Sequence, residues 1–125
     1  MKKKKNKNIK LEKLIKSIID KYAKILLLDK HTIELHYGVK GRDSLMETTF
    51  NYPYLDVNIH YGVNLIQYWK EGKDIIPIVV HELCHPITDP LYGKASARYV
   101  SIDEITDERE KLTDYISNIV IKNNL

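Results

Sequence analysis

The sequence contains only one cysteine among its 125 residues, and it has no long apolar run. One cysteine excludes an internal disulfide and suits a reducing compartment. Charges recur at positions 12, 13, 16 and 20, so the basic start is followed by neither a secretory signal core nor a membrane span. We therefore expect a cytoplasmic protein that has no membrane partner.

A strong excess of charge is also missing. The net charge is +3, and lysines at six of the first ten positions account for it. The rest is close to neutral, which argues against a dedicated nucleic-acid-binding surface. We predict that residues 1–8 form a disordered basic tail, whose run from Lys2 to Lys10 allows only weak contact with nucleic acid. Residues 9–125 are long enough for one core and predict a single globular domain.

The most informative pattern is H-E-L-C-H at residues 81–85. Two histidines four positions apart lie on one face of a helix, where both can bind one zinc ion. Zinc lowers the pKa of a bound water to roughly 7. Glu82 directly follows the first histidine, where it can act as general base on that water. The pattern predicts His81 and His85 as zinc ligands, Glu82 as the catalytic residue and Zn²⁺ as the cofactor.

Apolar residues surround this motif. Residues 75–80 read I-I-P-I-V-V, which predicts a buried helix that begins after Asp74 and ends near Pro86. Burying two histidines and a glutamate is costly unless a metal binds them. Cys84 lies on a different helical face from the histidines, so we expect it to be a small buried hydrophobe and not a ligand.

Periodicity predicts the elements before the motif. Apolar residues at helical spacing indicate an amphipathic helix from residue 9 to residue 28. Period-two alternation around residues 33–37, 46–52 and 55–61 predicts a three-stranded antiparallel sheet, whose third strand we expect to offer an open edge to an extended peptide. A short helix is expected over 63–70. The predicted fold class is therefore α+β.

The C-terminal part holds a less regular stretch and then a helix. Residues 87–100 lack a clear period and predict a long loop, in which Arg98 or Tyr99 could stabilise an oxyanion, although packing roles are the simpler interpretation. Ser101 and Glu104 form a capping box that begins the final helix.

That helix has to complete the site. A catalytic zinc site typically has three protein ligands, and no histidine follows His85, so the third ligand is expected among Glu104, Glu108 and Glu110. On a straight helix Glu108 shares a side with Leu112, Tyr115 and Ile119, which we expect to be packed, whereas Glu110 points toward the polar side. The residues alone leave the choice open.

Two motifs together resemble the gluzincin branch of the zinc metallopeptidases. H-E-x-x-H is followed by E-x-x-x-D, from Glu110 to Asp114, on a later helix. The resemblance implies that Glu110 is the third zinc ligand, with Glu108 as the alternative. It also implies that Asp114 does not bind the metal but holds one of the ligand histidines by a hydrogen bond. The chain looks most like small phage-type metallopeptidases, over roughly its last two-thirds.

The resemblance implies a minimal zincin-like domain that hydrolyses peptide bonds in a protein or peptide substrate. Its expected parts are an N-terminal helix, the three-stranded sheet, the H-E-x-x-H helix and a C-terminal helix. Two other functions remain open: a catalytically restricted or inactive regulator of a mobile element, and a DNA-associated protease tethered by the lysine tail. The sequence predicts neither the cleavage preference nor the oligomeric state.

Overall fold

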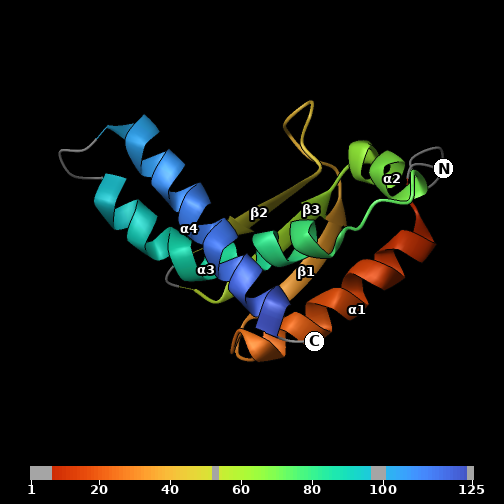
Figure 1. The fold of residues 1–125 in the computed structure, drawn as a ribbon, viewed down its shortest axis with the longest axis horizontal. Helices are drawn as coiled ribbons and strands as arrows, with labels where there is room; N and C mark the ends of the chain where they lie inside the picture. The colour runs from red at the N-terminus through yellow and green to blue at the C-terminus, as the bar shows by residue number, and fades with distance from the viewer. Residues whose placement is uncertain (1–6, 52–53, 97–100, 124–125) are drawn as a thin grey trace.

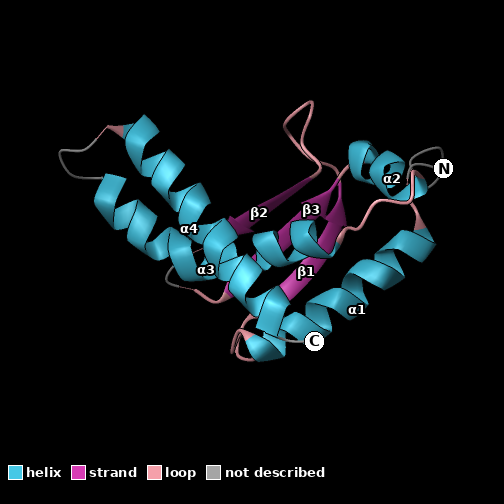
Figure 2. Ribbon diagram, in the orientation of Figure 1, coloured by secondary structure: helices cyan, strands magenta, loops and turns pink. Residues whose placement is uncertain are grey.

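The structure, a computed structural model, describes residues 7–51, 54–96 and 101–123. Four helices and a mixed three-stranded sheet form an α+β fold, as the sequence predicts (Figures 1 and 2). Within the described residues, none of the helices has the length and apolar character needed to cross a membrane. Most of the predicted basic tail, residues 1–6, lies outside the described residues.

Helix α1, Ile9–Ile25, begins where the sequence predicts and ends three residues earlier. Asn8 caps it, because its side chain accepts a hydrogen bond from the backbone N–H of Leu11. Glu12 on this helix accepts a 2.5 Å hydrogen bond from the hydroxyl of Tyr61. The apolar side of the helix packs against the core. The buried residues of this face are Leu11, Ile15, Ile18, Ile19 and Tyr22.

The sheet differs from the predicted antiparallel arrangement. Its strands are β1, Thr32–Tyr37, β2, Met46–Phe50, and β3, Asp56–Tyr61, and their order is β1-β3-β2. Strand β3 runs parallel to β1 and antiparallel to β2. The prediction was wrong because period-two alternation specifies which face of a strand is buried, and not which neighbour it pairs with.

The strand order also changes which strand lies at an open edge of the sheet. We expected the third strand to be exposed, but β3 pairs on both sides, and β2 is an edge strand. Helix α3 packs against β2. The strand beside the motif helix is therefore β2, which runs opposite to the other two strands.

Glu47 on β2 holds the loop that leads into this edge strand. Its carboxylate accepts the backbone N–H groups of Lys40, at 2.9 Å, and Gly41, at 2.8 Å. The bond from Lys40 has the larger effect and the bond from Gly41 the smaller, and both hold the pKa of Glu47 below its usual value. The loop over residues 38–45 is thereby tied to the strand that it precedes.

Helix α2, Val63–Lys70, matches the prediction, and Gly72 follows it with a positive φ of 82°. Trp69 is partly buried and packs against the core. Cys84 is fully buried, as predicted, and burial raises the pKa of its thiol to about 11.

Helix α3, Ile76–Ser96, is longer than predicted and has two prolines in its interior, Pro86 and Pro90. Asp74 accepts a hydrogen bond from the N–H of Ile76 at the start, as expected for a cap. The helix continues through Pro86, so the predicted loop over 87–100 is helical up to residue 96. Arg98 and Tyr99 lie outside the described residues.

The edge strand lies beside the helix at the turn before Pro86. A proline removes the hydrogen bond that residue i would donate to the carbonyl of residue i−4, which here is Glu82. The hydroxyl oxygen of Thr48, on β2, lies 3.2 Å from that carbonyl oxygen. The freed carbonyl therefore faces a polar group of the neighbouring strand, a contact that local sequence does not reveal.

Helix α4, Ile102–Asn123, begins after Ser101, whose hydroxyl accepts the N–H of Glu104, as the capping box predicts. Its packed side differs in part from the expected one. The buried residues are Thr113 and Ser117, and Ile116 and Val120 pack against the core as expected, whereas three other apolar residues that we expected to be packed are exposed. The exposed fractions are 41% for Leu112, 67% for Tyr115 and 46% for Ile119.

Replacing Glu47 with glutamine tests the loop anchor. A carboxylate whose pKa is lower in the folded state stabilises the fold above its unfolded pKa, and this contribution is lost as the pH falls through the folded pKa. Glu47 is largely solvated, so we expect E47Q to lose about 1 kcal/mol or less of unfolding free energy at pH 7. Urea denaturation should show a smaller deficit at pH 3, and an equal deficit at both pH values would contradict the assignment.

Candidate metal centre

Helix α3 presents His81 and His85 one turn apart, with their ring centroids 4.9 Å from each other. His85 is 8% exposed, and the residues between the two histidines are buried in the core. Helix α4 packs along α3, and the two helices lie side by side in Figure 1. The pair of imidazoles therefore faces a second helix.

Glu110 on α4 meets both histidines. Its Oε1 lies 3.1 Å from Nε2 of His81 and 4.0 Å from Nε2 of His85. One ligand atom from each of these three residues lies within 4.8 Å of the other two. The sequence prediction of these three as one set of ligands therefore corresponds to one cluster in the structure.

The other two glutamates point elsewhere. Glu108 pairs with Lys111 at 3.4 Å, and both side chains are about three-quarters exposed, at 73% and 75%. Glu104 interacts with Ser101 at the start of α4. Glu110 lies on the packed side because Thr113 and Ser117, three and seven residues later, are the buried positions of the helix. Small hydroxyl residues are the buried positions on this side of α4, and Thr113 contacts Thr88 of α3 at 3.0 Å.

Each histidine is held through its other ring nitrogen. Nδ1 of His81 lies 2.6 Å from Oδ1 of Asp114, the partner that the resemblance implies. Nδ1 of His85 lies 3.1 Å from Oδ1 of Asp89. A carboxylate only accepts hydrogen bonds, so the ring proton that faces each aspartate is expected on Nδ1, which would leave the lone pair of Nε2 for a metal ion bound between the histidines and Glu110.

Asp89 is a site residue that the sequence reasoning missed. It follows His85 by four residues, the spacing that places two side chains on one helical face. The signal was hidden because Pro86 was taken to end the helix. Burial alone would lower the pKa of His85, but the hydrogen bond and charge of Asp89, with the charges of Glu82 and Glu110, raise it above its usual value.

Arg109 contacts both Glu110 and Asp89, and the sequence reasoning also missed it. Its guanidinium donates to Oε2 of Glu110 through Nε at 3.1 Å, and Nη2 lies 3.1 Å from the same oxygen. Nη1 lies 3.8 Å from Oδ1 of Asp89, the partner of His85. One arginine therefore orients Glu110 and neutralises part of the charge of both carboxylates.

Glu82 lies beside the cluster at 8% exposure. The hydroxyl of Thr48 donates to its Oε1 at 2.5 Å, from the edge strand β2. Burial raises the pKa of Glu82 above its usual value, and the Thr48 bond and the charges of His85 and His81 oppose that shift in part. Thr48 is a third contact that sequence spacing did not indicate, because strand and helix meet only in the fold.

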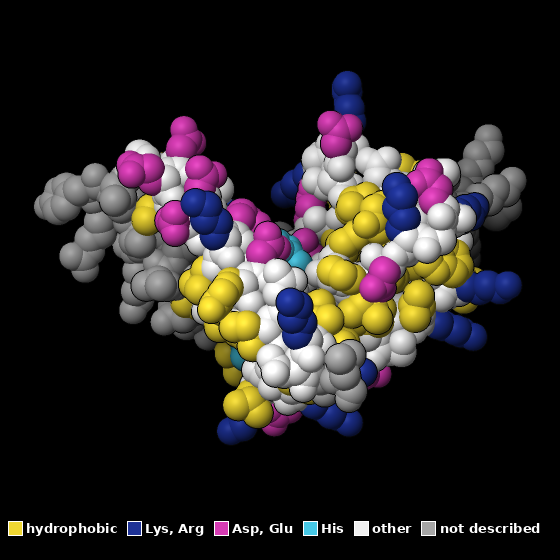
Figure 3. Space-filling view, in the orientation of Figure 1, with side chains coloured by type: hydrophobic (Ala, Val, Ile, Leu, Met, Phe, Trp, Pro, Cys, Tyr) yellow, Lys and Arg dark blue, Asp and Glu magenta, His cyan; other side chains and the backbone are white. Residues whose placement is uncertain are grey.

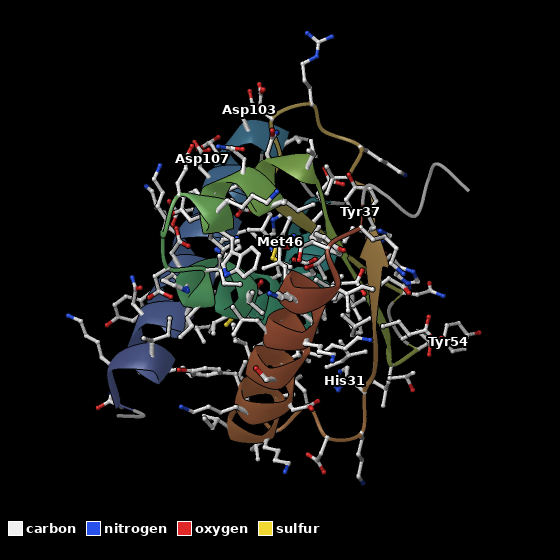
Figure 4. All side chains as sticks on the ribbon, turned by 90° about the vertical axis from the view of Figure 1, so that its right-hand side faces the viewer. His31, Tyr37, Met46, Tyr54, Asp103 and Asp107 are labelled. Carbon is white, nitrogen blue, oxygen red and sulfur yellow. The ribbon has the colours of Figure 1, made fainter. Side chains whose placement is uncertain are left out.

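The remaining histidines lie away from the cluster. His36 and His60 stack on each other across β1 and β3, with ring centroids 5.0 Å apart. His31 packs against Phe50. Figure 4 shows His31 well separated from Met46, which lines the same pocket as His81.

The donor set fits a divalent metal ion. Two ligand atoms bound at 2.0–2.1 Å to one tetrahedral ion lie about 3.3 Å apart, close to the 3.1 Å between Nε2 of His81 and Oε1 of Glu110. Two imidazoles and one carboxylate are the ligands of catalytic zinc sites, and they also suit non-haem iron. The carboxylates on both Nδ1 atoms are the outer partners typical of such ligands.

Comparisons with known proteins do not identify a family. No family description, no curated protein and no solved structure matches this chain. The chemistry of the site is therefore argued from the residues and contacts described above.

Replacing Arg109 with glutamine tests its role in the cluster. Without the guanidinium, Glu110 loses its hydrogen-bond donor and faces Asp89 without the intervening positive charge. We expect R109Q to weaken zinc affinity about 10- to 100-fold, measured by competition with a chromophoric chelator.

Lys111 provides a matched control for this measurement. K111Q also removes one positive charge from α4 and also breaks a contact with a glutamate, but that glutamate is the exposed Glu108. The affinity of K111Q should stay within about twofold of the unchanged protein, the size expected for an exposed ion pair. Equal losses in both variants would mean that Arg109 acts only through net charge.

Proposed function

We propose that this protein is a zinc metallopeptidase in which His81, His85 and Glu110 hold the metal and Glu82 is the general base. The observation that carries the proposal is the convergence of three ligand side chains from two helices next to a buried glutamate. A bound zinc ion would polarise the substrate carbonyl and lower the pKa of an attacking water to roughly 7.

The residues of this chain have separate tasks in that reaction. Thr48 fixes Glu82 through Oε1, which leaves Oε2 to accept a proton from the attacking water and deliver it to the leaving amine. Asp114 and Asp89 orient the two imidazoles, and Arg109 orients Glu110. The ligands are therefore positioned before a substrate arrives, which lowers the entropic cost of reaching the reactive geometry.

The edge strand β2 supports a peptide as the substrate. It contacts Glu82 through Thr48 and is an edge of the described sheet. An extended peptide can add to such an edge through backbone hydrogen bonds. A peptide bound along β2 would pass beside Glu82, so one strand would both hold the substrate and orient the base.

Replacing Glu82 with glutamine tests the assignment of the base. Glutamine preserves the shape and the contact with Thr48 but cannot accept the proton. E82Q should keep about one zinc per chain and lose about 10²- to 10⁴-fold in kcat on unstructured peptides. Unchanged peptidase activity in a metal-loaded E82Q protein would remove Glu82 from the mechanism.

Glu110 and Glu108 form a matched pair for the metal assignment. Elemental analysis should find zinc greatly reduced in E110A and near one equivalent in E108A, because only Glu110 faces the histidines. Zinc loss in E108A with retention in E110A would reverse the ligand assignment. A protein that binds zinc but cleaves none of a broad set of unfolded substrates would instead favour a regulator.

A further inference from the structure

A pocket of about 430 Å³ opens onto the candidate metal centre. Its apolar walls come from Leu45 and Met46 at the start of β2 and from Pro77 and Ile78 in the first turn of α3. The motif residues His81 and Glu82 also line it. Figure 3 shows a hollow in this region, with a histidine in cyan at its floor and acidic side chains in magenta around it. A side chain in this pocket would lie next to the reacting bond.

The charges of the pocket have one sign. Apart from His81, the charged side chains among the described residues that line it are Asp43, Glu82 and Asp114, all acidic. Glu82 and Asp114 are engaged by Thr48 and His81. Asp43 is exposed and belongs to the loop before β2. It is therefore the acidic group that can meet a substrate side chain without disturbing the candidate metal ligands.

The loop that carries Asp43 is anchored on both sides of that residue. The N–H of Ser44 donates to the carbonyl of Gly41 at 3.2 Å, which closes a turn around positions 42 and 43. Gly41 is in turn held by the carboxylate of Glu47, and the carbonyl of Arg42 accepts the side-chain amide of Asn64 on α2. The carboxylate of Asp43 is thus presented by a fixed turn.

We infer that this pocket selects a lysine or arginine side chain next to the scissile bond. The aliphatic stem of such a residue would cover Leu45 and Ile78, while its charged end would pair with Asp43. A glutamate in the same place would meet only like charge on the described lining. This inference rests on the proposed peptidase function and adds a substrate class, namely peptides that are basic beside the cleaved bond.

A charge reversal at Asp43 tests this inference. Quenched fluorescent peptides would differ only in one residue, Lys, Met or Glu, placed on either side of the cleaved bond. The zinc-loaded protein should cleave the Lys peptide about five- to tenfold faster, in kcat/KM, than the Glu peptide, as expected when an exposed ion pair replaces a repulsion. D43N should reduce this ratio, and D43K should invert it.

Asp56 supplies the matched control. Asp56 is an exposed acidic residue at the first position of β3. The pocket lies near the other end of that strand, where Tyr61 pairs with Met46. D56K makes the same charge change away from the pocket and should keep the preference for Lys. Binding of labelled peptides to E82Q, measured by fluorescence anisotropy, should show the same order of preference, and D43K combined with E82Q should reverse it.

The possible failures are distinguishable. Equal cleavage of the Lys and Glu peptides, or an unchanged ratio in D43K, would overturn the substrate class and leave the peptidase function standing. The same change of ratio in D56K would show that net charge, and not the pocket, sets the preference. No cleavage of any peptide by the zinc-loaded protein would overturn both this inference and the proposed function.

Discussion

The structure depends on satisfying the polar groups that α3 buries. This helix places Glu82 and His85 among Val79, Leu83 and Cys84 in the core, where an unpaired polar group would be strongly destabilising. Its own backbone cannot supply the partners. Glu82 is paired by Thr48 on the edge strand β2, and His85 by Asp89 on α3 itself, with Glu110 on α4 4.0 Å from its other ring nitrogen. The contacts that pair these buried groups are therefore the contacts that build the candidate centre.

Thr48 shows how closely fold and chemistry are coupled. One hydroxyl lies within reach of both the carbonyl and the carboxylate of Glu82. The carbonyl lacks its helical donor because Pro86 stands four residues later. The carbonyl that the proline leaves without its helical donor therefore faces the edge strand, and that strand in turn orients the proposed base. On α4, Arg109 joins Asp89 to Glu110 in a comparable way.

Local patterns in the sequence predicted the elements better than their arrangement. The H-E-L-C-H spacing placed His81 and His85 on one helical face, and Ser101 marked the start of α4. Strand order was not predictable, because Ile33, Thr48 and Ile59 sit in alternating stretches that suit parallel and antiparallel pairing equally. The packed side of α4 was predicted only in part, because its buried positions are Thr113 and Ser117, and apolar periodicity does not detect small hydroxyl residues. Asp89 was hidden by the expected helix end at Pro86.

The measurement that tests the central claim most directly is the zinc X-ray absorption spectrum of the protein carrying one equivalent of zinc. If His81, His85 and Glu110 hold the ion, the spectrum should show nitrogen and oxygen neighbours at about 2.0–2.1 Å, with the outer scattering of two imidazoles and no sulfur. A sulfur neighbour at about 2.3 Å would implicate Cys84 and contradict the ligand set. A folded protein that leaves the zinc in solution would contradict the metal centre itself.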